Sequence, residues 1–131
     1  MPIKRSNRSI PAFQHYKNVS FETQAASWFT HDGWELYMPV IDHDMKTDLL
    51  VGDGSDFYRI QIKTVETDDE SSHVENKWGE AKIDYVIYFS RTANWGYIMK
   101  PFTQRRKRLN AKGSIRFHQH VKQFIKAFNK I

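Results

Sequence analysis

The fold that we predict rests on residues 46–65, KTDLLVGDGSDFYRIQIKTV. A short, almost wholly apolar segment, TDLLV (47–51), precedes the tight turn GDGS, and the next segment, FYRIQIKTV (57–65), alternates strictly between two sets of side chains. Such alternation is typical of a β-strand, and the turn residues make the two strands antiparallel neighbours. Because side chains two apart in a strand share a face, Gln61 and Lys63 point to the same side of the predicted hairpin.

Three polar side chains of this hairpin are expected to converge. Counting back from the turn places Asp48 near Arg59, within one or two residues of Gln61 and Lys63. A carboxylate, an amide oxygen and an ammonium group would then meet at one position of the sheet. Each side chain also has a purely structural explanation: Asp48 could cap a strand end, and the other two could belong to the exposed face of an amphipathic strand.

The same combination has a chemical use in the hydrolysis of a phosphodiester. That reaction needs a divalent cation to offset charge in the transition state, oxygen ligands to hold the cation, and a positive group near the attacking water. In this interpretation Asp48 is the principal Mg²⁺ ligand and the Gln61 carbonyl is a neutral second ligand. Lys63 orients the water or helps to deprotonate it. Mn²⁺ could substitute for Mg²⁺.

The segment DLLVGDGSDFYRIQIK (48–63) resembles the core of the PD-(D/E)XK nuclease superfamily. It departs from the motif at Thr47, where the family name has Pro, and at Gln61, where Asp or Glu is usual. Compact group I intron homing endonucleases of this fold carry a Q-x-K form and are the most similar branch; Holliday junction resolvases are similar more loosely. The resemblance covers about Ser20 to Phe102. It implies an α/β fold with a restriction-endonuclease-like αβββαβ core, in which helices flank a mixed central sheet.

A first helix is predicted over residues 21–31 and carries a further candidate. Ser20 is a suitable N-cap, the apolar side chains that follow recur with helical spacing, and HDG (31–33) is a suitable stop. The homing branch places a glutamate on this helix, and Glu22 fits that position. The resemblance therefore implies a catalytic set whose first three members bind metal: Glu22, Asp48, Gln61 and Lys63. Alternatively, Glu22 is a first-turn carboxylate favoured by the helix dipole.

Charge is distributed unevenly along the 131 residues. Residues 1–20 carry four basic residues, residues 100–131 carry ten, neither segment has an acidic residue, and the centre holds six basic and all 15 acidic residues. Two basic flanks suit a protein that binds a polyanion. We expect double-stranded DNA as the partner, contacted by the flanks through Lys4, Arg5, Arg8, Arg105, Arg106, Lys107 and Arg108. A merely solvated loop is the alternative for QRRKR (104–108).

The remaining segments predict a single nuclease-like domain over residues 1–131, with a basic arm at 1–18 and a basic C-terminal region at 103–131. Further strands are expected at WELYMPV (34–40), DYVIYFS (84–90) and WGYIMKPF (95–102), with a long polar loop at 66–82 and a helix at about 117–129. Most aromatic side chains occupy core positions; Trp78 and Trp95, at loop edges, are the only ones that we would test for contact with bases.

Several other classes of protein are excluded or disfavoured. The chain has no cysteine, so disulfides, Cys-based zinc sites and Cys nucleophiles are excluded, and its six His residues are scattered. DHDMKTDLLVGD (42–53) lacks the Gly and the closing Glu of a calcium loop. No segment resembles a signal peptide or a membrane span of about 20 apolar residues. We therefore expect a cytoplasmic protein, of a kind found in bacteria, phages or other viruses.

The sequence thus predicts a Mg²⁺-dependent endodeoxyribonuclease, site-specific in the manner of a homing enzyme. The alternatives are a Holliday junction resolvase, a non-catalytic DNA-binding protein with a decayed site, which Gln61 would favour, and an RNA-directed endonuclease. One site per small chain suggests that both strands are cut by a homodimer or a higher homo-oligomer, and a tetramer is one possibility.

Overall fold

Helix α1 (Ile10–His31) is the longest element of the computed structural model, which describes residues 2–131. The hydroxyl of Ser9 caps the helix by accepting from the Ala12 amide at 3.3 Å, and Pro11 suits the first turn. The prediction that the helix starts after Ser20 is wrong, since Ser20 lies inside it and donates its hydroxyl to the Lys17 carbonyl. The first turns escaped prediction because they bury almost nothing: only the second half of the helix contributes core residues. The predicted arm at 1–18 is therefore shorter, with residues 2–9 non-helical.

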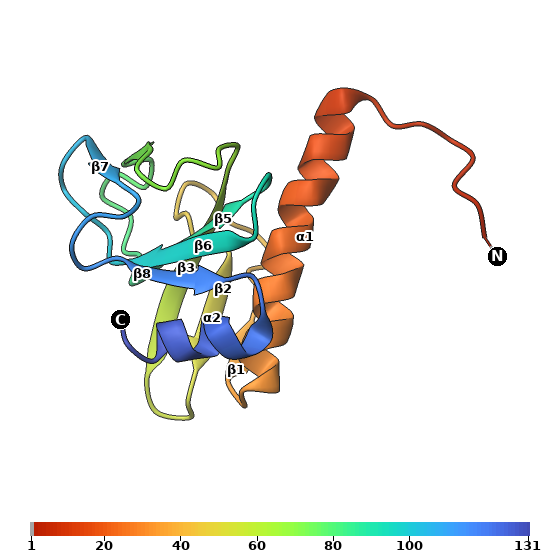
Figure 1. Ribbon diagram of the computed structural model, residues 1–131. Helices are drawn as coiled ribbons and strands as arrows, with labels where there is room; N and C mark the ends of the chain where they lie inside the picture. The colour runs from red at the N-terminus through yellow and green to blue at the C-terminus, as the bar shows by residue number, and fades with distance from the viewer. Residues whose placement is uncertain (1) are drawn as a thin grey trace.

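A six-stranded mixed sheet packs against α1 (Figure 1). Its strands lie in the order β1 (Glu35–Tyr37), β2 (Leu49–Gly52), β3 (Phe57–Val65), β5 (Tyr85–Ser90), β6 (Trp95–Met99) and β8 (Ile115–His118). Only β3 and β5 are parallel. After β8 the chain continues into helix α2 (Val121–Phe128). This helix begins four residues later than predicted because Phe117 belongs to β8. The predicted α/β fold with a mixed sheet and flanking helices is confirmed.

The connection between the parallel strands differs from the αβββαβ core that we expected. Within residues 2–131 it contains no helix but a short strand, β4 (His73–Glu75), which pairs with β7 (Arg106–Arg108) in a separate two-stranded ribbon. The basic segment 104–108 is therefore not a plain solvated loop. Figure 1 shows β7 on the far side of the sheet from α1.

The sheet has an apolar cluster on each face. Under the helices, Phe29 packs edge-on against Phe124 and Phe128 with ring centroids 5.1 and 4.9 Å apart. The opposite cluster lies beneath the ribbon and includes Trp78 and Trp95, each only 4% exposed. The two tryptophans singled out for tests of base contact are therefore core residues, without a ring face exposed for stacking.

The register of the β2–β3 hairpin also differs from the prediction. Arg59 pairs with Leu50, not with Asp48, and Leu49 pairs with Ile60. The shift arises because the four-residue connection is 53–56 and not the predicted GDGS (52–55): Gly52 still belongs to β2 and pairs with Phe57. The Asp53 carboxylate closes this connection by accepting from the amides of Ser55 and Asp56 at 2.9 and 2.7 Å. One further step of this register places Asp48 opposite Gln61.

None of the helices in the described part of the chain has the length and apolarity to span a bilayer.

Candidate active site

The candidate site lies where β2 separates from β3. Strand β2 pairs with β3 only as far as Ile60, whereas β3 continues to Val65 with β5 alone as its neighbour. One edge of β3 is therefore open at residues 61–65. Helix α1 runs beside this opening, and the Thr64 hydroxyl donates to the Asn18 side chain at 3.0 Å.

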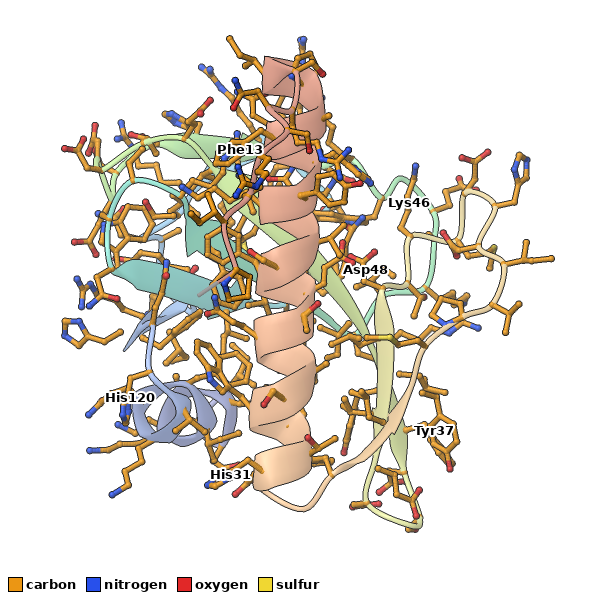
Figure 2. All side chains as sticks on the ribbon, turned by 90° about the vertical axis from the view of Figure 1, so that its right-hand side faces the viewer. Phe13, His31, Tyr37, Lys46, Asp48 and His120 are labelled. Atoms are coloured by element: carbon orange, nitrogen blue, oxygen red, sulfur yellow. The ribbon has the colours of Figure 1, made fainter. Side chains whose placement is uncertain are left out.

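Asp48 stands at the entrance to the opening, just before β2. Its amide donates to the Ile60 carbonyl at 2.9 Å, and its carboxylate oxygen Oδ2 accepts from the Ile62 amide at 2.7 Å. The carboxylate thus replaces the carbonyl that β2 would otherwise have supplied to β3. Figure 2 shows Asp48 beside the middle of α1, with Lys46 on the adjoining loop.

Gln61 is one of two polar residues among the buried ones, with 5% of its surface exposed. Its carbonyl oxygen Oε1 is shielded from solvent and has no hydrogen-bond partner within residues 2–131. A buried acceptor without a donor costs free energy of about 1–3 kcal/mol, so its retention calls for an explanation. A cation bound by this oxygen would supply one.

Lys63 and Glu22 line a pocket of about 290 Å³ between β3 and α1, together with His15, Asn18 and Thr64. Glu22 points to this pocket because it lies one residue after the buried Phe21, at the edge of the apolar stripe of α1. The helix position that the resemblance suggested for a catalytic glutamate therefore does face the open edge of β3.

The pKa values of the two carboxyl groups of the site are both raised. Burial raises the pKa of Glu22, and the charge of Asp48 raises it further. Burial also raises the pKa of Asp48, and the nearby Asp42 adds to this, although the Ile62 amide and Lys63 act in the opposite direction. The effect of the Asp48 charge on the pKa of Glu22 indicates that the two carboxylates lie near each other.

The pKa of Lys63 is shifted in the opposite direction, downward. Burial lowers the pKa of its ammonium group, the charge of Asp48 opposes this, and Lys46 and Lys77 lower it further. A lysine of this kind loses its proton more readily than a solvated one, as a group that handles the proton of a water molecule requires. Sequence reasoning missed three of these neighbouring charges: Asp42, Lys46 and Lys77.

The donor set fits a divalent cation with two anionic ligands. No group of three or more His, Asp or Glu side chains with metal-binding geometry occurs within residues 2–131, so a site built from carboxylates and histidines alone is not present there. Glu22, Asp48 and the unpartnered Gln61 oxygen instead supply two carboxylates and one amide carbonyl. Oxygen donors of these types suit Mg²⁺, which retains water for its other positions.

The predicted DNA-binding residues form two groups away from the hairpin. Lys4 lies over the Phe13 ring and Arg8 over the Tyr16 ring, 5.8 and 5.3 Å from the centroids, along the exposed first turns of α1, and Arg5 is exposed nearby in sequence. The other four belong to or adjoin β7, and Lys107 alone is turned inward, 5.9 Å from the Phe102 centroid.

Comparison with known proteins supports the architecture. A solved bacterial homing endonuclease, I-Ssp6803I, superimposes with a TM-score of 0.57 at 14% identity, over 73% of this chain and 74% of the other. The chain has a nuclease-like fold. No protein-family model and no curated protein sequence matches it. The likeness thus lies in the three-dimensional structure and not in the sequence.

Proposed function

We propose that this protein is a metal-dependent DNA endonuclease of the PD-(D/E)XK type that cuts double-stranded DNA at a specific site. The observation that carries the proposal is the unpartnered oxygen of Gln61, buried opposite Asp48 at the open edge of β3. Buried polar atoms usually have a hydrogen-bond partner, whereas an oxygen that serves as a metal ligand stays available, and Asp48, across from it in the register, offers a carboxylate as a second ligand. The likeness to a homing endonuclease supports this choice of reaction.

Glu22, Asp48 and Gln61 would hold a divalent cation, Mg²⁺ or Mn²⁺. The bound cation would supply Lewis acidity and charge neutralisation at the scissile phosphate. Asp48 has a second task, because its bond to the Ile62 amide fixes the carboxylate against β3. Its other oxygen stays available to the cation.

Lys63 would act on the attacking water. Lys63 borders the pocket that Glu22 also lines, and the lowered pKa makes its neutral form more accessible than that of a solvated lysine. In the neutral form it can accept a proton from water; in the charged form it holds the water by a hydrogen bond and faces the phosphate. Both roles require Lys63 to stay beside Asp48, as the electrostatic coupling between them indicates.

DNA is the proposed substrate because the basic side chains lie on both sides of the acidic site. Lys4 and Arg8 lie against Phe13 and Tyr16 of α1, and strand β7, which carries further basic residues, lies on the opposite side of the sheet (Figure 1). A polyanion passing the open edge of β3 could contact both groups. Each candidate site offers one set of catalytic residues, so double-strand cutting would require a homodimer or a larger homo-oligomer.

The test is incubation of the purified protein with linear duplex, plasmid and four-way-junction DNA, with Mg²⁺, Mn²⁺ or EDTA. We expect cutting that requires the metal, that Lys63→Ala reduces at least about 100-fold, and that Lys126→Ala leaves unchanged. Lys126 is a matched control because it is exposed on α2, away from the site. Preference for the junction would indicate a resolvase. If a genome-scale library of duplexes were bound but left intact, the protein would be a non-catalytic DNA-binding protein.

A further inference from the structure

The β4–β7 ribbon has an outer face made of charged and hydrogen-bonding side chains. Its register pairs His73 with Arg108, Val74 with Lys107, and Glu75 with Arg106. Val74 is buried in the cluster beneath the ribbon, and Lys107 is turned inward. The outer face therefore consists of the alternate positions, all of them exposed: His73, Glu75, Arg106 and Arg108.

The two arginines of this outer face have hydrogen-bond donors that are free to bind a ligand. The Arg106 side chain makes no hydrogen bond or ion pair within residues 2–131, so all its guanidinium donors are available. Arg108 uses one nitrogen to donate to the Ser71 carbonyl at 3.2 Å, which orients the guanidinium while its other donors stay available. Glu75, the one acid, is paired with Lys77 at 3.4 Å. The face thus presents two guanidinium groups: that of Arg106 is accessible, and that of Arg108 is held in place by its hydrogen bond.

The ribbon also covers the face of the sheet to which Val65, at the end of β3, contributes its side chain. Val65 packs against the cluster that holds Val74 and Trp78. Lys77, directly after β4, is close enough to lower the pKa of Lys63, after the larger effects of burial, Asp48 and Lys46. DNA bound at Lys63 would therefore pass beside the ribbon.

We propose that the β4–β7 ribbon enters the major groove of the DNA and that Arg106 and Arg108 read guanine edges there. This inference rests on the proposed function, since it assigns the sequence specificity of the same enzyme. The major groove is about 12 Å wide and admits a two-stranded β-ribbon, and arginine binds the O6 and N7 atoms of guanine with two hydrogen bonds.

The spacing of the two arginines favours base reading over simple phosphate contact. Residues two apart in a strand are about 6.7 Å apart, and two successive base steps of duplex DNA rise about 6.8 Å. Arg106 and Arg108 therefore match guanines two steps apart on one strand. Glu75, across from Arg106, can accept from the amino group of a cytosine in the same site.

The experiment is selection of bound sites from a randomised duplex library, with Ca²⁺ in place of Mg²⁺ so that sites are bound rather than cut. The wild-type chain is compared with Arg106→Lys, Arg108→Lys and the control Lys126→Ala. Lysine keeps the charge and the phosphate attraction but cannot make the two-pronged bond. Circular dichroism of each variant verifies folding, and the exposed Arg106 provides the variant least able to disturb it.

The selected site is then remade with 7-deazaguanine, which lacks the N7 acceptor in the major groove, or with inosine, which lacks only the minor-groove amino group. We expect 7-deazaguanine to weaken wild-type binding about tenfold or more at each position read, and inosine to have little effect. Each Lys variant should lose the preference for one guanine and bind unselected DNA as before.

The outcomes separate this inference from the proposed function. Unchanged guanine preference in both Lys variants, or wild-type binding that tolerates 7-deazaguanine, would overturn the role of the ribbon while leaving the nuclease proposal intact. Failure of the wild-type chain to bind any duplex would overturn both. Guanine selection that depends on these arginines, in a protein that never cuts, would uphold the ribbon and reject the nuclease.

Discussion

The Asp48 carboxylate lies 2.7 Å from the Ile62 amide and closes the gap that β2 leaves on the edge of β3. Asp48 is therefore part of the fold as well as a proposed metal ligand. Two substitutions of Asp48 therefore have to be distinguished, one that keeps a hydrogen-bond acceptor for the Ile62 amide and one that does not.

Asp48→Asn and Asp48→Ala should differ in stability but not in activity. Asparagine keeps an oxygen that can accept from Ile62, whereas alanine leaves that amide, in a residue only 7% exposed, without an acceptor, at a cost of about 1–3 kcal/mol. Both variants should lose at least about 100-fold in cleavage, since each removes the anionic ligand. Urea unfolding and a DNA cleavage assay measure the two effects. Equal stability of both variants would show that the hydrogen bond contributes little.

Gln61→Leu should separate metal binding from packing. Leucine fills similar space without an unpartnered oxygen, so the metal-free variant should be at least as stable as the wild-type protein, by up to about 2 kcal/mol. Mg²⁺ should raise the melting temperature of the wild-type chain and not that of Gln61→Leu. A Mg²⁺ shift of equal size in both proteins would remove Gln61 from the metal site.

Gln61→Glu restores the commoner residue of the superfamily. It adds a third carboxylate beside Glu22 and Asp48, whose pKa values are already raised. We expect tighter binding of Mg²⁺ at alkaline pH and retained cleavage, with a changed preference between Mg²⁺ and Mn²⁺. Titration calorimetry with each metal measures this. Loss of binding for both metals would argue that the position does not face the cation.

Glu22 should make the stability of the metal-free protein depend on pH. Its pKa is raised in the folded state, so its contribution to stability is fully present below 4.5 and is lost as the pH rises through the raised value. Glu22→Gln removes that loss, so its stability relative to wild type should increase across this window, by less than about 1 kcal/mol because the side chain is partly exposed to solvent. Urea unfolding between pH 4 and 7 provides the measurement. Glu80→Gln, an exposed carboxylate after β4, is the control for loss of charge alone.

The N-terminal cations should contribute to affinity and not to specificity. Arg5→Ala removes an exposed charge that the fold does not use, so the slope of log K against log salt concentration should fall by about 0.9 if Arg5 contacts one phosphate. The cleavage site should stay the same. Binding isotherms at four salt concentrations test this, with Lys126→Ala as the matched loss of one charge. An identical slope for Arg5→Ala and wild type would place residue 5 outside the interface.

Local patterns in the sequence were enough to predict most of the central sheet. The segment FYRIQIKTV coincides with β3, because strict alternation and the Gly-containing turn before it act over a few residues. The strands at DYVIYFS and WGYIMKPF appear as β5 and β6, and the stop at HDG ends α1, where Gly33 adopts a φ of +89°. The same alternation led to the correct expectation that Asp48, Gln61 and Lys63 lie together, although their chemical roles stay predictions.

Features that depend on contacts between distant segments could not be predicted. Strands β4 and β7 have three residues each and lie about 30 positions apart, so neither shows a periodicity and only their pairing makes them strands. The hairpin register was decided by the Asp53 loop, and the approach of Glu22 to Asp48 by the packing of α1 on the sheet.

The sequence by itself therefore determined which side chains the hairpin offers, because a strand and its turn are specified by neighbouring residues. Only the tertiary structure decided which of those side chains lose solvent and which meet. Burial leaves the Gln61 oxygen without a partner, brings a second carboxylate to Asp48, and lays a basic ribbon over the face that carries Lys63. Burial of side chains and contacts between distant segments depend on how the whole chain packs, and both are needed to bring the motif residues together as a candidate site.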